Sequence, residues 1–246
     1  MPKPGITPLL LLRSTLYALG MLVVTPIYFV IILLAFPLKP IKRYRVIAVW
    51  SRIMLAWLRL TCGLTYRVIG AENLPGQPSI VLSKHQSAWE TLAFQQIIPP
   101  LVWVLKRELL RIPFFGWGLA MGVPIAIDRG AGKEALKQVV EQGKDRLAQG
   151  FWVVVFPEGT RVRPGEKGKY NIGGAFLAVH TGTTVVPVAH NAGEFWGKNA
   201  FLKYPGIITL SIGAPIDPAG MKPGELNAQV EAWIESEMVR IGQAGR

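Results

Sequence analysis

A histidine and a carboxylate, separated by four residues, directly follow a short apolar run in this sequence. Residues 79–90 read Ser-Ile-Val-Leu-Ser-Lys-His-Gln-Ser-Ala-Trp-Glu. A carboxylate that accepts a hydrogen bond from one imidazole nitrogen makes the other nitrogen a better base. The pattern therefore indicates a candidate general base, His85, oriented by Glu90. The alternative is a solvent-exposed histidine beside an unrelated helical glutamate.

The elements around this pair must bring its two side chains together. Residues 80–82 are predicted to form a strand, and a helix is predicted to begin at Glu90, where the helix dipole favours an ionised carboxylate. His85 then lies on the loop after a strand's carboxyl end, where open α/β sheets usually hold ligands. On a continuous helix, residues five apart point about 140° apart, at roughly 3.6 residues per turn. The pair can therefore meet only if the chain bends between strand and helix.

The rest of the chain alternates between strand and helix patterns. Apolar runs predict further strands at residues 66–70, 101–105, 124–129, 151–156, 185–189 and 207–212. Amphipathic or small-residue patterns predict helices at 132–149, 172–181 and 226–238, and residues 106–118 are predicted to turn over at their proline and glycines. The expected fold class is therefore α/β, with a mostly parallel central sheet flanked by helices.

An uncharged stretch near the N-terminus indicates attachment to a membrane. Residues 14–38 contain no charged side chain, and as a helix they could cross a hydrocarbon layer of about 30 Å. Pro26 is expected to kink this helix, which leaves open a spanning helix and a bent hairpin within one leaflet. The basic cluster after residue 38 favours a cytoplasmic position for the rest of the chain.

A second N-terminal helix is predicted at residues 46–64. Three arginines spaced seven apart fall on one stripe among apolar residues, a pattern typical of a helix in the headgroup region: Arg45, Arg52 and Arg59. An ordinary helix packed on the domain is the alternative. The expected division is residues 1–64 as membrane-anchoring helices and residues 65–246 as the α/β domain.

Composition points to an anionic partner at a membrane. The chain has 246 residues, 27 Lys and Arg against 15 Asp and Glu, a net charge of +12, and a mean hydropathy of +0.33. Phosphorylated ligands, acidic lipids or nucleic acid would each suit this charge, but the uncharged stretch argues against nucleic acid. The single cysteine, Cys62, excludes an intrachain disulfide. One Cys and three His supply few zinc ligands, so no metal is expected.

Charged residues also follow two other predicted strands. Lys106 ends one, and residues 156–161, Phe-Pro-Glu-Gly-Thr-Arg, follow another. Gly159 would let the backbone approach a ligand closely, and Thr160 and Arg161 can donate hydrogen bonds to phosphate oxygens. In a mostly parallel sheet these ends share one edge with His85. The alternative for residues 156–161 is a turn with a solvated arginine.

Residues 85–90 together with residues 156–161 resemble the glycerolipid acyltransferases, in particular the 1-acyl-sn-glycerol-3-phosphate acyltransferases that make phosphatidic acid. Three weaker blocks are similar to that family in the same order: residues 106–116, 125–129 and 186–188. The family's acid is usually aspartate, whereas this chain has Glu90. The side chain is one methylene longer, so the helix start or the imidazole must shift to keep the contact.

The resemblance implies a reaction and a role for each motif residue. His85 would act as general base on the sn-2 hydroxyl of lysophosphatidic acid, with Glu90 orienting the imidazole. The hydroxyl would attack the thioester of acyl-CoA or acyl-acyl carrier protein directly, without an acyl-enzyme and without a metal or other cofactor. The residues expected to hold the phosphate are Lys106, Arg129 and Arg161, and those expected to shape its pocket are Glu158, Gly159 and Thr160.

The expected location is a bacterial-type inner membrane, with the catalytic domain facing the cytoplasm and in contact with membrane phospholipids. Within the same chemistry, the acceptor could be another lysolipid, such as a lyso-ornithine lipid, or glycerol 3-phosphate. A protein of a different class, a non-catalytic membrane module that binds anionic lipids, would share the charge and the apolar segment. Substitution of His85 discriminates between an enzyme and such a module.

Overall fold

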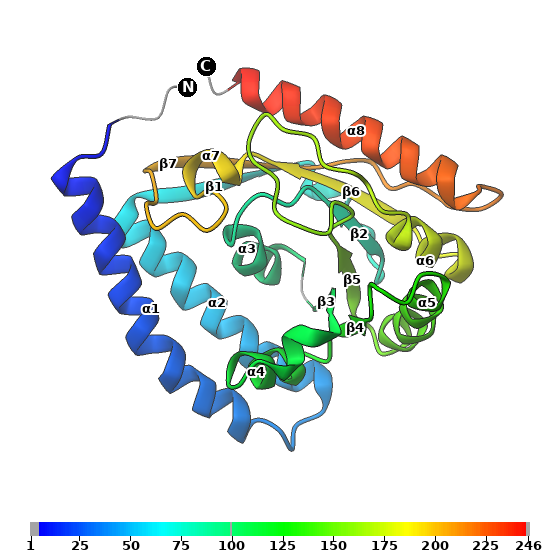
Figure 1. Ribbon diagram of the computed structural model, residues 1–246, viewed down its shortest axis with the longest axis horizontal. Coiled ribbons are helices and arrows are strands. Elements are labelled where there is room, and N and C mark those ends of the chain that lie inside the picture. The colour runs from blue at the N-terminus through cyan, green and yellow to red at the C-terminus, as the bar shows by residue number, and fades with distance from the viewer. Residues whose placement is uncertain (1–4, 99, 245–246) are drawn as a thin grey trace.

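The computed structural model describes residues 5–98 and 100–244 and confirms the α/β prediction (Figure 1). A seven-stranded sheet runs through these residues in the order β1-β7-β6-β2-β5-β3-β4. Its neighbouring strands pair in parallel, apart from the antiparallel pair β6 and β7. The strands are β1 (Leu64–Ile69), β2 (Ile80–Ser83), β3 (Leu101–Lys106), β4 (Ile125–Ile127), β5 (Trp152–Val155), β6 (Val185–His190) and β7 (Gly206–Ile212).

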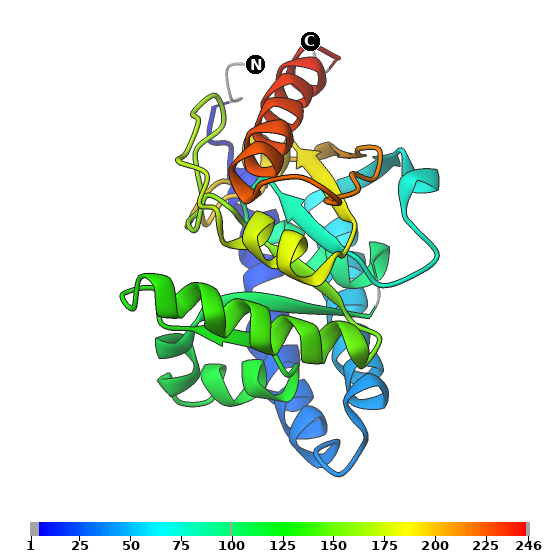
Figure 2. The same cartoon turned by 90° about the vertical axis from the view of Figure 1, so that its right-hand side faces the viewer.

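Helices cover both faces of the sheet, as Figures 1 and 2 show. One face carries α5 (Lys133–Ala148), α6 (Gly173–Thr181) and α8 (Pro223–Ala244). The other carries α3 (Trp89–Ile97) and α2 (Pro40–Cys62), and α1 (Pro8–Leu34) packs on α2. Four short helical segments complete the described elements: η1 (Ala71–Asn73), η2 (Arg107–Arg111), α4 (Phe115–Met121) and α7 (Ala192–Phe195).

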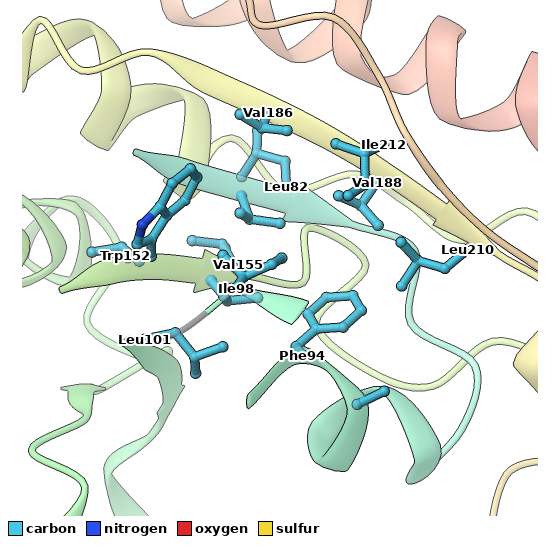
Figure 3. Packing of buried hydrophobic residues seen from close by; sticks show 14 of the residues in the cluster. Leu82, Phe94, Ile98, Leu101, Trp152, Val155, Val186, Val188, Leu210 and Ile212 are labelled. Carbon is cyan, nitrogen blue, oxygen red and sulfur yellow. The ribbon is translucent and has the colours of Figure 1, made fainter. Parts of the chain in front are cut away.

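The core lies on both sides of the central strands (Figure 3). Every residue of β2, β5 and β6 is buried, as expected of parallel strands covered on both faces. Leu82 packs closely under α6, because a Cβ built on Gly174 would lie only 2.3 Å from the Leu82 side chain. A glycine at this position thus lets α6 approach β2, just below the strand end that carries His85.

The predicted N-terminal apolar helix is present as α1, one continuous helix that passes through Pro26. Residues 14–34 do not form the bent hairpin that was one of the two alternatives, and α1 packs against α2. Among the described residues, α1 is the one helix long and apolar enough to cross a membrane, and only 11% of its most apolar window is buried.

The N-terminal half of α1 is fastened to the α/β part of the chain. Tyr17 is fully buried, and its ring meets the edge of the Trp196 ring at 5.5 Å. The hydroxyl of Ser14 accepts a hydrogen bond from the backbone N–H of Lys203 at 3.1 Å. These contacts hold the N-terminal half of α1 against the α/β part of the chain, and α1 as a whole runs beside α2 (Figure 1).

Residues 106–118 turn at Pro113, as predicted, but not at their glycines. They contain η2 and the first part of α4, which pack on one another. The backbone N–H of Gly116 donates to the carbonyl of Ile112 at 2.7 Å, and a Cβ on Gly116 would lie 2.3 Å from the carbonyl oxygen of Leu110. Gly116 lies within α4, where the absence of a side chain permits this close contact between two short helices.

Candidate active site

The loop between β2 and α3 brings His85 and Glu90 together. The chain leaves β2 at Ser83 and enters α3 at Trp89, which supplies the bend that the spacing requires. His85 Nδ1 lies 2.8 Å from Glu90 Oε1. The backbone N–H groups of Gln86 and Ser87 donate to the same carboxylate oxygen at 2.9 and 2.8 Å. The loop thus wraps around the carboxylate and fixes it beside the imidazole.

The surroundings of this pair favour an ionised carboxylate and a partly accessible imidazole. The Glu90 side chain is 0% exposed and that of His85 is 15% exposed. Burial by itself raises the pKa of the Glu90 carboxyl, but nearby His190 and the hydrogen bonds from His85 and Ser87 outweigh it and lower the pKa below its ordinary value. With Nδ1–H donating to Glu90, His85 keeps Nε2 as the nitrogen that can accept a proton.

Stacked aromatic rings fix the plane of the imidazole. The His85 ring stacks on Phe156, with ring centres 3.9 Å apart and planes 13° from parallel. Phe156 in turn stacks on Trp103 at 5.6 Å. These rings come from the ends of β2 and β5 and from β3, so three neighbouring strands support the orientation of the candidate base.

A buried cluster of charges, absent from the sequence prediction, lies behind the His85 loop. Lys84 is 1% exposed, and its Nζ lies 2.8 Å from Glu158 Oε1 and 2.8 Å from Glu235 Oε1. Glu158 Oε2 accepts the backbone N–H of His85 at 3.0 Å, and Tyr170 donates its hydroxyl to Glu235 at 2.7 Å. A buried charge requires such partners, and the cluster ties the His85 loop to α8.

Glu158 therefore points inward, toward Lys84 and the backbone of His85. Its predicted part in the phosphate pocket stays a prediction, whereas its contact with the His85 loop is direct. The backbone N–H of Val162 also donates to the carbonyl of His85, at 2.8 Å. Residues 158–162 thus lie alongside the candidate base, which places Arg161 next to a residue bonded to His85.

The predicted phosphate-binding cations follow neighbouring strands. Lys106 is the last residue of β3 and is exposed, and Arg161 is half-buried on the loop after β5. Within the described part of the chain, neither side chain has a hydrogen-bond or ion-pair partner. Arg129, after β4, donates to the carbonyl of Gly159 at 2.6 Å, so the structure joins these two predicted residues. Burial lowers the pKa of the Arg129 guanidinium.

Two details of the 159–161 loop bear on an anion site. Gly159 has φ of +68°, and a Cβ there would meet Arg129 Nη1 at 3.2 Å, so glycine is required at this position. Thr160 is exposed, and its hydroxyl accepts a hydrogen bond from Lys198 Nζ at 3.4 Å. Lys198 was not among the predicted residues and adds a further cation at this loop.

An apolar cavity of about 200 Å³ lies on the α1–α2 side of the sheet. Helices α1, α2 and α4 and strand β3 supply its walls. One wall is Trp103, the ring that stacks on Phe156 and so connects the cavity with His85. The lining residues include Tyr28, Phe29, Ile32, Ile47, Phe115 and Leu119.

Other reactive side chains are engaged elsewhere. Cys62 is buried at the end of α2, with its Sγ 3.6 Å from the carbonyl of Arg13. The Ser87 hydroxyl accepts the backbone N–H of Trp89 at 3.1 Å. His190 is fully buried, with Nε2 2.9 Å from the carbonyl of Lys84, and burial lowers its pKa. No cluster of three or more His, Cys, Asp or Glu suited to a metal occurs among the described residues.

The family of the chain follows from the site and from its relatives. Residues 65–191 match the family model described as Acyltransferase, so the chain belongs to the acyltransferase family. The 1-acyl-sn-glycerol-3-phosphate acyltransferase of Pseudomonas aeruginosa is 48% identical over 210 residues, which cover 83% of this chain and 82% of that protein. Within the family, the chain belongs with the 1-acyl-sn-glycerol-3-phosphate acyltransferases.

More distant relatives agree with this placement. The human 1-acyl-sn-glycerol-3-phosphate acyltransferase alpha is 30% identical over 180 residues, covering 72% of this chain and 64% of the human protein. The crystal structure of the 1-acyl-sn-glycerophosphate acyltransferase from Thermotoga maritima superposes with a TM-score of 0.74 at 26% identity and covers 95% of both chains. The similarity therefore extends through the N-terminal helices.

Proposed function

We propose that this protein transfers an acyl chain from acyl-CoA or acyl-acyl carrier protein to the sn-2 hydroxyl of 1-acyl-sn-glycerol 3-phosphate, giving phosphatidic acid. The observation that carries the proposal is the His85–Glu90 contact of 2.8 Å, inside a loop whose backbone holds the same carboxylate oxygen. The names of the relatives supply the substrate class.

In the proposed reaction, His85 Nε2 accepts the proton of the sn-2 hydroxyl as its oxygen attacks the thioester carbonyl carbon. The buried Glu90 carboxylate holds the ring and stabilises the imidazolium that forms. The tetrahedral intermediate then expels the thiol sulfur, which takes the proton from His85. No protein nucleophile is needed, in keeping with the buried position of Cys62 and the engaged hydroxyl of Ser87.

The acceptor's phosphate is assigned to the cations after β3 and β5. Lys106 and Arg161 have no partner among the described residues, so an anion can bind them without breaking an existing ion pair. Arg161 can contact two phosphate oxygens through its planar fork. Arg129 shapes the 159–161 loop by its bond to Gly159 and keeps further N–H donors for the anion. Thr160, with Lys198, borders the same loop.

An acyl chain is the occupant that best suits the apolar cavity. Aromatic and aliphatic side chains line it, and Trp103 in its wall is connected to His85 through Phe156. Chains in such a cavity are bound by removing apolar surface from water. A chain held there would place its carboxyl end toward the stacked rings and therefore toward the candidate base.

The N-terminal helices, residues 1–64, are proposed to attach the protein to the cytoplasmic face of a bacterial-type inner membrane. α1 is fastened to the domain by Ser14 and Tyr17, and many of its apolar side chains are exposed. A helix held along the domain favours the one-leaflet arrangement over a separate span. Arg45, Arg52 and Arg59 are exposed on α2 and suit lipid phosphates.

An acceptor panel tests the proposed substrate. The purified protein is given acyl-CoA with lysophosphatidic acid, a lyso-ornithine lipid or glycerol 3-phosphate, and each product is quantified. We expect turnover with lysophosphatidic acid and a loss of preference for it in Arg161→Ala. Equal use of the lyso-ornithine lipid would refute a phosphate-bearing acceptor. Vesicle binding without transfer to any acceptor would favour the non-catalytic lipid-binding module.

A further inference from the structure

An exposed apolar ridge lies outside the N-terminal helices, and two of its residues, Phe114 and Phe115, also line the apolar cavity. It consists of Ile112, Phe114, Phe115 and Trp117, at the end of η2 and in α4, and is called the apolar wedge below. Each of these side chains is 45–65% exposed. Large apolar side chains gathered in this way mark a binding surface.

The backbone of the apolar wedge holds an aromatic residue in an unfavourable conformation. Phe114 has φ of +62°, in the left-handed region that bulky residues rarely adopt. Its ring packs edge-on against Phe29 of α1 at 6.1 Å and lies 5.2 Å from the Trp117 ring. Such strain persists only where the surrounding structure imposes it, and here the result is a row of aromatic rings continuous with α1.

A buried arginine holds the apolar wedge and the α1–α2 turn in one rigid unit. Arg43 of α2 is 8% exposed. Its Nε donates to the carbonyl of Met121, the last residue of α4, at 2.7 Å. Its Nη1 donates to the carbonyl of Phe36, in the α1–α2 turn, at 3.1 Å. Figure 1 places α4 beside the half of α1 that leads into this turn.

Exposed apolar side chains lie on both sides of this junction and are together called the apolar face. The C-terminal half of α1 and the turn contribute Ile27, Val30, Ile31, Leu34, Phe36 and Leu38. Exposed cations border it, namely Lys39, Lys42 and Arg111, and residues 1–71 and 109–127 contain no Asp or Glu. An apolar face with aromatic rings and a purely cationic border is complementary to the headgroup boundary of an anionic bilayer.

We infer that the apolar wedge inserts into the bilayer as a second membrane contact, together with the C-terminal half of α1. The inference rests on the membrane attachment proposed above and adds a contact that begins 48 residues beyond residue 64, where the N-terminal segment ends. It also orients the protein, because the axis of a helix and a further contact beside it define a plane. That plane brings Phe115, which lines the apolar cavity and is 56% exposed, against the lipid.

Depth-dependent fluorescence quenching tests the inference on the full chain. An environment-sensitive fluorophore is attached to Trp117→Cys, to Leu22→Cys on exposed α1, or to Lys137→Cys on α5. Each variant is mixed with phosphatidylglycerol–phosphatidylethanolamine vesicles that contain lipids brominated near the headgroup or near the chain end. Cys62 is buried, and labelling of the parent chain measures its background.

We expect bromolipid quenching at positions 117 and 22 but not at 137. Quenching at 22 alone would overturn the apolar wedge while leaving the N-terminal anchor intact. No quenching at either position would overturn both the inference and the proposed attachment. The label at position 117 could instead become shielded from water as the protein concentration rises in the absence of lipid, with no bromolipid quenching when vesicles are added. That result would make the apolar wedge an interface with a second copy of the chain and would overturn the inference.

A substitution gives an independent measurement. Trp117→Gln should weaken binding to the same vesicles about fivefold. The variant loses the transfer of the exposed half of the Trp117 side chain from water into the bilayer. Its activity on detergent-dispersed substrates should match the parent, because Trp117 does not line the cavity or contact the site residues. Val239→Gln, at an exposed apolar position on α8, is the matched control. Equal vesicle binding by both variants would contradict the inference.

Discussion

Replacement of Glu90 by glutamine tests the role of the buried carboxylate. Glu90 Oε1 accepts hydrogen bonds from the His85 ring and from two backbone N–H groups, and a glutamine oxygen can keep those bonds. What is lost is the negative charge beside the imidazolium that forms in the reaction. Two charges about 4 Å apart interact by about 4 kcal/mol at an effective dielectric constant of about 20. We therefore expect kcat to fall about 10³-fold.

The kinetic pattern matters as much as the magnitude. Glu90 is 0% exposed and cannot touch either substrate, so the KM values for acyl-CoA and lysophosphatidic acid should stay within about twofold of the parent. Initial rates over both substrate concentrations in detergent micelles measure this, with thermal unfolding to verify folding. Glu141→Gln, at an exposed position on α5, is the control.

A one-methylene change refines this test. Glu90→Asp keeps the charge but withdraws the carboxylate by about 1.5 Å, so the 2.8 Å contact opens to about 4 Å, beyond hydrogen-bond range. Its kcat should therefore lie between those of the parent and Glu90→Gln. A fall of less than tenfold in Glu90→Gln, or a rise in KM with kcat unchanged, would refute the reasoning.

Four further outcomes are expected. Arg161→Ala should raise the KM for lysophosphatidic acid about 10-fold to 100-fold, the worth of a charge-assisted hydrogen bond, and an unchanged KM would remove Arg161 from the phosphate site. Leu119→Trp, which fills part of the apolar cavity, should shift donor preference in a chain-length series toward shorter acyl chains; an unchanged profile would move the chain elsewhere. Lys84→Met should destabilise the fold by about 3–5 kcal/mol, because Glu158 is left as a buried unpaired charge; chemical denaturation should show partial recovery in Lys84→Met/Glu158→Gln. Folding lowers the pKa of Glu90, so the unfolded chain binds more protons than the folded one near the ordinary pKa of 4.5. The stability advantage of the parent over Glu90→Gln should therefore be full at neutral pH and shrink as pH falls through 4.5 and below. A difference in the free energy of unfolding that grows on acidification would contradict this.

The sequence was sufficient for the sheet and for the pairing of His85 with Glu90. Buried parallel strands are continuous apolar runs, and β2, β5 and β6 are of this kind. The five-residue spacing of the pair required a bend, and a strand followed by a helix supplies one. The glutamate in place of aspartate also keeps the contact, since the loop backbone holds the longer side chain in position.

The buried charges behind the loop could not be predicted in the same way. Lys84 is local in sequence to His85, but its partner Glu235 lies 151 positions away on α8. A lysine at a strand end ordinarily reads as a solvent-exposed residue, and no local pattern shows which distant carboxylate meets it. The one available signal was a charged residue at the end of a largely apolar strand, which requires a partner if buried.

The positions of α1 and α4 were also beyond the sequence. The apolar pattern of α1 predicts a helix but contains no information on the contact that buries Tyr17 against Trp196. The turn at Pro113 follows the prediction, but no local pattern shows that Gly116 packs against Leu110 of η2. Both arrangements come from packing contacts between elements, and together they produce the apolar face that is proposed to meet the bilayer.

The central claim is that His85 removes the proton from the acceptor's sn-2 hydroxyl. The most direct measurement is the single-turnover rate of phosphatidic acid formation by purified parent and His85→Ala protein, with vesicle binding measured in parallel. We predict a fall of at least about 10³-fold in the rate, with unchanged vesicle binding and no acyl-enzyme in either protein. A His85→Ala rate within tenfold of the parent, or a trapped acyl-enzyme that proceeds to product, would contradict the account.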